Sequence, residues 1–209
     1  MADDLHDLIL ELTQTGRDAV GRGLVLASAG NLSARRPGAD EFVVTATGTW
    51  LDRLAVGDFA VMGLDGKVRR GNPRPSSEWK LHQRTYRVRP DVNAVIHLHP
   101  QTAVLLDALG HPVRLITADH ARYLGKVARI PYAPNGSDEL ADTAAEASRD
   151  CDAVILAFHG SSTLGDTIEM TYRRALNLED AAANTFRCLQ LGNTDLTFPP
   201  AELDRLHHA

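Results

Sequence analysis

The chain has 209 residues, 44% of them hydrophobic, and its 22 Lys and Arg residues stand against 27 Asp and Glu residues. This length is enough to bury one sizeable core, so we expect a single domain over residues 1–209. The mildly acidic balance disfavours nucleic acid as a partner, and no apolar run approaches the ~20 residues that span a membrane. The opening residues are unlike a secretory signal, and two widely spaced cysteines are typical of a reduced, cytoplasmic protein.

Hydrophobic periodicity predicts the elements of the first half of the chain. We expect a helix over 3–22, strands over 24–26 and 42–45, a hairpin over 59–68 and a helix over 76–89. Asp65-Gly66 supplies the turn of the hairpin, and Pro90 stops the helix before it. The small and polar residues over 28–33 are interpreted as a break between strands.

The second half alternates strands and helices. We expect strands over 93–100, 127–130 and 153–158, and helices over 101–109, 137–149 and 166–192. Asp166 and Glu169 resemble a capping box at the start of the last helix. The tail after 192 shows no clear period. Together with the hairpin, this loose alternation predicts an α/β fold in which helices cover a mixed sheet.

The segment 93–100 carries two histidines at the end of a predicted buried strand. Side chains alternate along a strand, so His97 and His99 point to one face while Ile96 and Leu98 point into the core. Two imidazoles held on one face can share a metal ion. The alternative is chance, since the chain has nine histidines.

A third histidine, His159, follows the continuous apolar run of the second buried strand. Alone it would be interpreted as a hydrogen-bonded core residue. Three histidines aimed at one point from strand ends leave a fourth position on Zn²⁺ for substrate or water, so together they favour a metal site.

Three turns of small residues offer hydroxyl and N–H donors for a phosphate, and the alternative for each is ordinary turn chemistry. These turns contain Gly30 and Asn31, Thr47 and Gly48, and Ser76 and Ser77. Glu78 follows directly. It is either a charge favoured in a first helical turn or, beside a metal, a ligand or general base.

Five of these motifs occur in the order and at roughly the intervals of the class II aldolase/adducin family. They are Ala29-Gly30-Asn31-Leu32-Ser33, Thr47-Gly48, Ser76-Ser77-Glu78, His97-Leu98-His99 and His159-Gly160. The chain therefore resembles this family over essentially its whole length, and within it most resembles the L-fuculose-1-phosphate aldolases. The L-ribulose-5-phosphate 4-epimerases and some sugar-acid phosphate decarboxylases are related branches.

The resemblance implies a three-layer α/β/α sandwich around a mixed, mainly antiparallel sheet. It also implies a homotetramer with active sites at the subunit interfaces and a phosphorylated sugar as substrate. By motif match, His97, His99 and His159 hold one Zn²⁺ per chain. Glu78 is a further ligand in the resting site and the proton carrier. The six residues of the small-residue turns match the phosphate-binding loops.

Two departures from the aldolase pattern leave the second proton carrier open. His120 stands near the position of a family tyrosine, and no tyrosine follows Tyr172 in the tail. Asp119 resembles the acid/base of the epimerases. Glu78 favours an aldolase that releases dihydroxyacetone phosphate and a small aldehyde such as L-lactaldehyde, whereas Asp119 favours an epimerase or decarboxylase. A non-catalytic adducin-like module tends to lack the three histidines.

Overall fold

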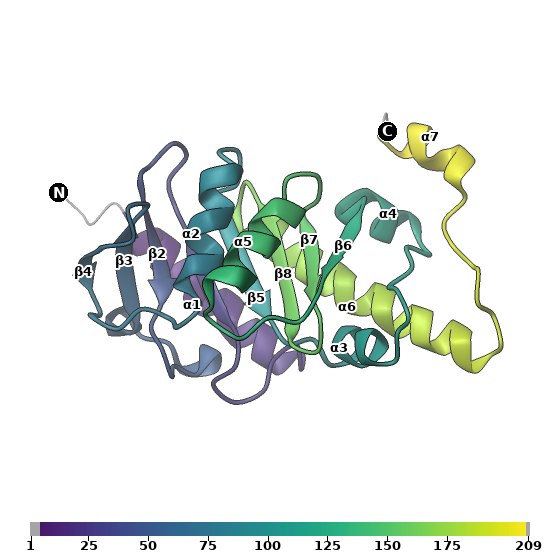
Figure 1. The fold of residues 1–209 in the computed structure, drawn as a ribbon, viewed down its shortest axis with the longest axis horizontal. Helices are drawn as coiled ribbons and strands as arrows, with labels where there is room; N and C mark the ends of the chain where they lie inside the picture. Colours follow the sequence, from purple (N-terminus) through teal and green to yellow (C-terminus); the bar gives the residue numbers. More distant parts are fainter. Residues whose placement is uncertain (1–4, 208–209) are drawn as a thin grey trace.

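The computed structural model describes residues 5–207, in which one eight-stranded sheet carries helices on both faces (Figure 1). The strands are β1 Asn31–Ala34, β2 Glu41–Thr45, β3 Phe59–Gly63, β4 Val68–Gly71, β5 Ala94–Leu98, β6 Val127–Ile130, β7 Ala153–Leu156 and β8 Gly160–Gly165. Their order is β4-β3-β2-β1-β5-β8-β7-β6, and every neighbouring pair is antiparallel except β6 with β7. The predicted mixed, mainly antiparallel sheet is confirmed.

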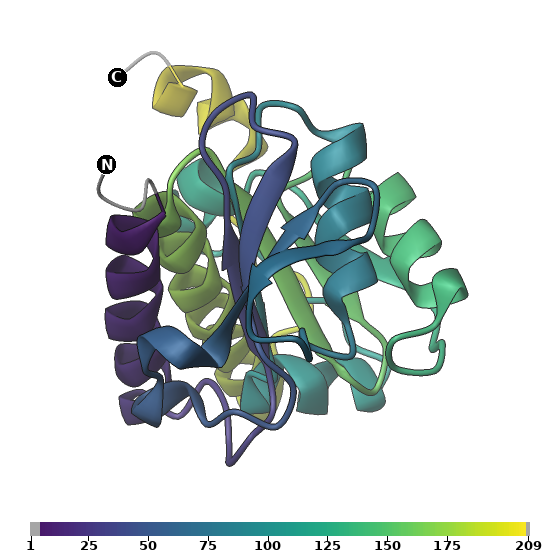
Figure 2. The same ribbon diagram turned by 90° about the vertical axis from the view of Figure 1, so that its left-hand side faces the viewer.

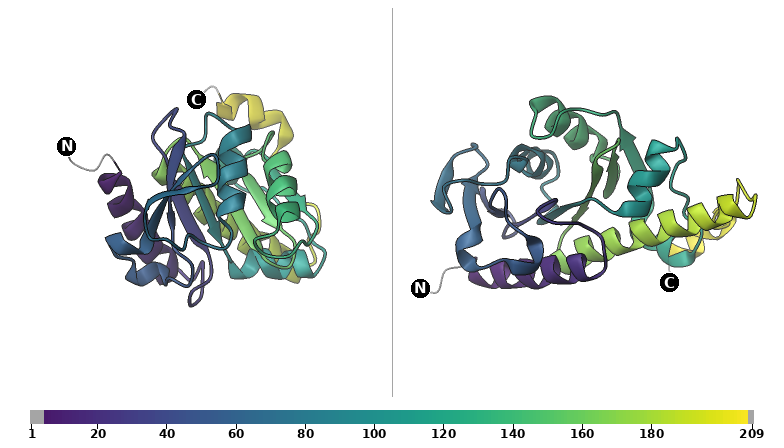
Figure 3. Two further views of the ribbon diagram at one scale, coloured as in Figure 1. Left: turned by 60° about the vertical axis from the view of Figure 1, so that its left-hand side comes forward. Right: turned by 90° about the horizontal axis from the view of Figure 1, so that it is seen from below.

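Seven α-helices lie in the described range, and most of them cover the two faces of the sheet. They are α1 His6–Gly21, α2 Trp79–Val88, α3 Gln101–Ala108, α4 Ala118–Leu124, α5 Asp138–Ala147, α6 Ile168–Gln190 and α7 Leu203–His207. Figure 2 shows α1 and α6 on one side of the sheet and α2 and α5 on the other. Seen from below in Figure 3, α1 and α6 follow one another along the same face. The three-layer α/β/α architecture is therefore confirmed. No helix in the described range is both long and apolar enough to cross a membrane.

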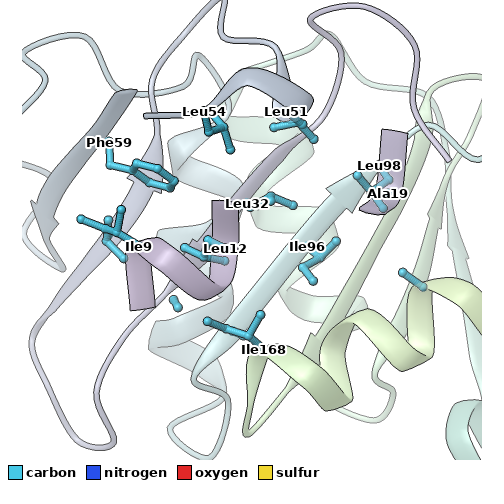
Figure 4. Packing of buried hydrophobic residues seen from close by; sticks show 14 of the residues in the cluster. Ile9, Leu12, Ala19, Leu32, Leu51, Leu54, Phe59, Ile96, Leu98 and Ile168 are labelled. Atoms are coloured by element: carbon cyan, nitrogen blue, oxygen red, sulfur yellow. The ribbon is translucent and has the colours of Figure 1, made fainter. Parts of the chain in front are cut away.

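The alternation of β5 decides which of its residues reach the core. Ile96 and Leu98 pack with Leu12 of α1 and Leu32 of β1 in a fully buried cluster (Figure 4). His97 lies between them in sequence and points to the opposite face, toward α2. Burial of the apolar set therefore fixes the register of β5 and, with it, the direction of the histidine.

The first strand lies later in the chain than predicted. Residues 24–26 form no strand, although Leu24 and Val25 are buried, because this short apolar run packs as a loop after α1. The predicted break contains β1 instead. Its Asn31 and Ser33 are polar because they face hydrogen-bonding partners on α2 rather than apolar ones.

Two predicted helix starts are also displaced. The helix expected from Ser76 begins at Trp79, because the Ser76 N–H pairs with the Thr45 carbonyl and keeps that segment extended beside β2. The predicted capping box at Asp166 is wrong. Thr167 is the N-cap of α6, and its hydroxyl accepts the Met170 N–H. The predicted start of the first helix, Asp3, lies outside the described residues.

The central strand β8 and the helix of the tail went unpredicted. Residues 160–165 are mainly Gly, Ser and Thr, yet they pair with both β5 and β7. The preceding strand ends at Leu156 rather than Phe158, so His159 lies in the tight turn between β7 and β8. In the tail, the Phe198 N–H donates to the Leu115 carbonyl, and α7 packs against α4.

Candidate active site

Three imidazoles meet where the end of β5 adjoins the start of β8. Nitrogens of His97, His99 and His159 lie within 4.8 Å of one another, and the Nε2 atoms of His97 and His99 are 3.0 Å apart. Gly160 makes this approach possible, since a Cβ there would overlap the Leu98 carbonyl oxygen and lie 2.9 Å from the His99 ring. The antiparallel pairing of β5 with β8 thus brings the three predicted histidines together.

The ring of His97 is oriented by the backbone of β8. Its Nδ1 lies 2.9 Å from the Ser161 carbonyl oxygen, which can only accept, so Nδ1 carries the proton. The other ring nitrogen, Nε2, therefore faces His99 and Glu78. A backbone partner of this kind is the usual way in which a metal-binding histidine is held in one tautomer.

Glu78, the N-cap residue of α2, completes the cluster. Its side chain is 8% exposed, with Oε2 3.2 Å from His97 Nε2 and Oε1 3.5 Å from His159 Nε2. The Asn31 side-chain amide donates to Oε2 at 2.9 Å. Burial alone would raise the pKa of Glu78, but the two histidines and the amide outweigh burial and hold that pKa well below its usual range.

The donor set fits a divalent metal ion. Both ring nitrogens of His159 and Oε1 of Glu78 are buried without a hydrogen-bond partner in the described part of the chain. Burial, together with charge on His97, lowers the pKa of His99 to about 3 and that of His159 to about 4, so both rings are neutral at neutral pH. Neutral imidazoles and a carboxylate are ligands that Zn²⁺ accepts, and a metal would satisfy the orphaned atoms.

A polar cavity of about 310 Å³ opens beside this cluster. Glu78 and His99 line it. So do all six residues predicted as phosphate ligands, namely Gly30, Asn31, Thr47, Gly48, Ser76 and Ser77. Its size is at the lower end of small-molecule sites. No lysine or arginine is among the described residues that line it, so an anion there is held by hydroxyl and N–H donors.

Sequence reasoning missed Ser28, Thr49 and Asn135, which also line the cavity. Asn135 comes from the loop before α5. That loop lies close to Ser77, since a Cβ on Gly136 would lie 2.6 Å from the Ser77 carbonyl oxygen. The Pro-Asn-Gly sequence signals a turn, but nothing local shows that the turn folds back onto Ser77, 59 positions before Gly136 in the chain.

The structure does not bring Asp119 and His120 to this cavity within one chain. Both lie on α4. His120 is buried, with Nε2 2.7 Å from an Asp180 carboxylate oxygen of α6, and its Nδ1 accepts the N–H groups of Ile116 and Thr117. Asp119 is exposed to solvent. His120 therefore anchors α4 to α6 in the single chain.

The sheet, the histidine cluster and the cavity define an α/β protein with a candidate metal centre beside a small polar cavity. Residues 10–186 match the family model described as the class II aldolase and adducin N-terminal domain. A solved L-fuculose 1-phosphate aldolase superimposes with a TM-score of 0.90 at 29% identity, covering 100% of this chain and 97% of that one.

Relatives of known description agree with this match. The L-fuculose phosphate aldolase of Methanocaldococcus jannaschii is 36% identical over 169 residues, covering 81% of this chain and 90% of its own. The 5-methylthioribulose-1-phosphate/5-deoxyribulose-1-phosphate aldolase of Rhodospirillum rubrum is 33% identical over 196 residues, covering 93% and 87%. A 3-oxo-tetronate 4-phosphate decarboxylase from Haemophilus influenzae is 31% identical over 179 residues, covering 83% and 80%.

The chain belongs to the class II aldolase and adducin family. Its aldolase relatives make it a lyase, and class II aldolases depend on a metal ion. The family resemblance drawn from the sequence motifs is confirmed.

Proposed function

We propose that this chain is a zinc-dependent aldolase. It reversibly cleaves a ketose 1-phosphate of the L-fuculose 1-phosphate type to dihydroxyacetone phosphate and a small aldehyde such as L-lactaldehyde. One observation carries the proposal: Glu78 lies between the three histidines and a cavity lined by the phosphate-loop residues. Similarity to aldolases acting on 1-phosphorylated ketoses supports it.

In this proposal His97, His99, His159 and Glu78 hold one Zn²⁺ per chain. When bound, the metal supplies Lewis-acid stabilisation of the negative charge that develops on the substrate oxygens. Breaking the carbon–carbon bond leaves an electron pair on the carbon next to the ketone, while the hydroxyl on the other fragment loses its proton and becomes the aldehyde. The Glu78 carboxylate, ionised at rest, takes up this proton and delivers it to the carbon that holds the electron pair. The phosphate loops orient the substrate away from the reacting carbons.

Another reaction on the same scaffold is the alternative. Asp119 resembles an epimerase acid/base, and a decarboxylase is among the similar proteins. Incubation with L-fuculose 1-phosphate, L-ribulose 5-phosphate and a 3-oxo sugar-acid phosphate separates the possibilities. We expect triose phosphate from the first substrate. The D-xylulose epimer or carbon dioxide, formed without triose phosphate, would overturn the aldolase proposal and make Asp119 the next residue to mutate.

Phosphate recognition is expected to depend on Ser76. Its hydroxyl lies 5% exposed at the cavity and already accepts the Glu78 N–H. Loss of a hydrogen bond to a charged group in Ser76→Ala should cost ~1.5–3 kcal/mol in kcat/KM, mainly as a higher KM. Ser148→Ala is the matched control, because that buried hydroxyl bonds the Ala145 carbonyl away from the cavity. An unchanged KM in Ser76→Ala would place the phosphate elsewhere.

We propose that the chain assembles as a homotetramer in the cytoplasm, with each site completed by a neighbour. Family resemblance supports this, and so do two exposed aromatic residues close to the site in sequence: Phe158 is 62% exposed beside His159, and Tyr132 is 59% exposed. A neighbouring chain would also give Asp119, which is exposed on α4, access to a site. Light scattering at micromolar concentration should give four times the chain mass. A monomer would contradict the assembly and its shared sites.

A further inference from the structure

Behind the cavity, a chain of hydrogen bonds leads from Glu78 into the layer between β1 and α2. The Asn31 amide links the Glu78 carboxylate to Nε2 of His82. His82 Nδ1 lies 2.6 Å from the Ser33 hydroxyl, which lies 2.7 Å from the Tyr86 hydroxyl. His82 and Ser33 have no exposed surface, and Asn31 is 5% exposed.

The two elements present these residues at matching intervals. Asn31 and Ser33 are two apart on β1 and share a face, while Glu78, His82 and Tyr86 recur every fourth residue along α2. Neither His82 nor Tyr86 was predicted as a site residue from the sequence. Their spacing from Glu78 is the signal that places them on the same side of the helix.

For a neutral His82 ring, one set of proton positions satisfies every contact with an attractive hydrogen bond. The carboxylate of Glu78 accepts, so Nδ2 of Asn31 donates to it and Oδ1 of Asn31 faces His82. The Nε2 atom of His82 must then donate to that oxygen, which leaves Nδ1 to accept from Ser33. Burial, with the charge of His97, lowers the pKa of His82 to about 3, so the ring is neutral with its single proton on Nε2.

We propose that His82 is a positioning residue, which acts through the Asn31 amide to hold Glu78 against the histidine cluster. This rests on the proposed function, because Glu78 is its proton carrier. If the donor at Nε2 is lost, the Asn31 amide is free to turn over. Its carbonyl oxygen would then face the Glu78 carboxylate, where two acceptors repel one another.

The tautomer of His82 tests this inference without any substrate. Nitrogen NMR of the ¹⁵N-histidine-labelled protein as purified distinguishes a protonated ring nitrogen from an accepting one, and loss of the signals in His82→Gln assigns them. We expect a neutral ring with a proton on Nε2 and none on Nδ1. A proton on Nδ1, or a doubly protonated ring at neutral pH, would overturn the proposal.

Kinetics of matched variants add a second readout. Gln carries its amide nitrogen as many bonds from Cβ as Nε2 of His, so His82→Gln should restore the donor and stay within about threefold of wild type in kcat. His82→Leu has no donor, and we expect kcat to fall ~10–100-fold with the metal content unchanged. Gln83→Leu is the control on the same helix, since that buried amide bonds the Leu64 carbonyl.

The outcomes separate a positioning role from a structural one. Equal kcat losses in His82→Leu and Gln83→Leu, or in His82→Leu and His82→Gln, would show that only packing matters and refute the proposal. If His82→Leu does not fold, the tautomer in the unmutated protein decides. Wild-type protein without aldolase activity but with the Nε2 tautomer would refute the proposed function and leave the hydrogen-bonded orientation intact.

Discussion

Glu78→Gln is expected to keep the fold and the metal and to lose most of the rate. Positioned general acid–base groups contribute ~10²–10⁴-fold, and Gln cannot carry the proton to the freed carbon. Structure should survive, because the Gln oxygen still accepts from the Asn31 amide and the side chain keeps its volume at a site that is 6% exposed. The measurement is kcat on the cleaved ketose phosphate, with metal content and thermal unfolding measured on the same preparations.

Glu41→Gln is the matched control for the loss of one carboxylate. Glu41 starts β2 and pairs with Arg70 across the sheet at 2.8 Å, away from the cavity. Its replacement should leave kcat unchanged within about twofold, because exposed ion pairs contribute little. A Glu78→Gln enzyme with full kcat would exclude Glu78 as proton carrier. Loss of metal in that variant would show that the three histidines alone do not retain the ion.

The Glu78→Asp variant distinguishes the ability of the side chain to carry a proton from its ability to reach the substrate. The shorter carboxylate still titrates but is withdrawn by one methylene from the histidines, so we expect an intermediate rate. A rate equal to that of Glu78→Gln would indicate that position matters as much as chemistry, in keeping with the hydrogen bonds that fix this carboxylate.

The apolar half of the architecture could be predicted from sequence. β5 and β7 are hydrophobic because they are covered on both faces, and their residues reach full burial as expected. β8 could not be predicted in the same way. Its small residues are selected by the close approach of β5 and by the long α6 that crosses it, and neither constraint is visible in a local window.

The residues of the candidate site also fall into those that the sequence predicts and those that it does not. Local motifs were enough to bring together the histidines and the phosphate-loop residues, since each motif sits at the end of a strand or next to one. His82 and Asn135 depend on contacts between elements distant in the chain. The fold of one chain places neither Asp119 nor His120 at the cavity, because both lie on α4, which His120 ties to Asp180 of α6.

Among the effects on metal content, we expect the largest in His97→Ala, which should lose the metal. Metal analysis of purified wild-type protein should give near-stoichiometric zinc. His97 has no exposed surface, its Nδ1 is fixed by Ser161, and its Nε2 faces the other two histidines. Removing the most rigidly oriented ligand should lower affinity by more than the ~10–100-fold typical of losing an outer partner.

His111→Ala is the control for the loss of one imidazole, since that residue is exposed after α3 and lies outside the cluster. Its metal content should equal that of wild type. In His97→Ala the buried Glu78 carboxylate also loses a partner at 3.2 Å, so the thermal midpoint should fall even in metal-free protein. A His97→Ala protein that retains full metal would disprove the three-histidine centre, because the ion would then be bound by other side chains.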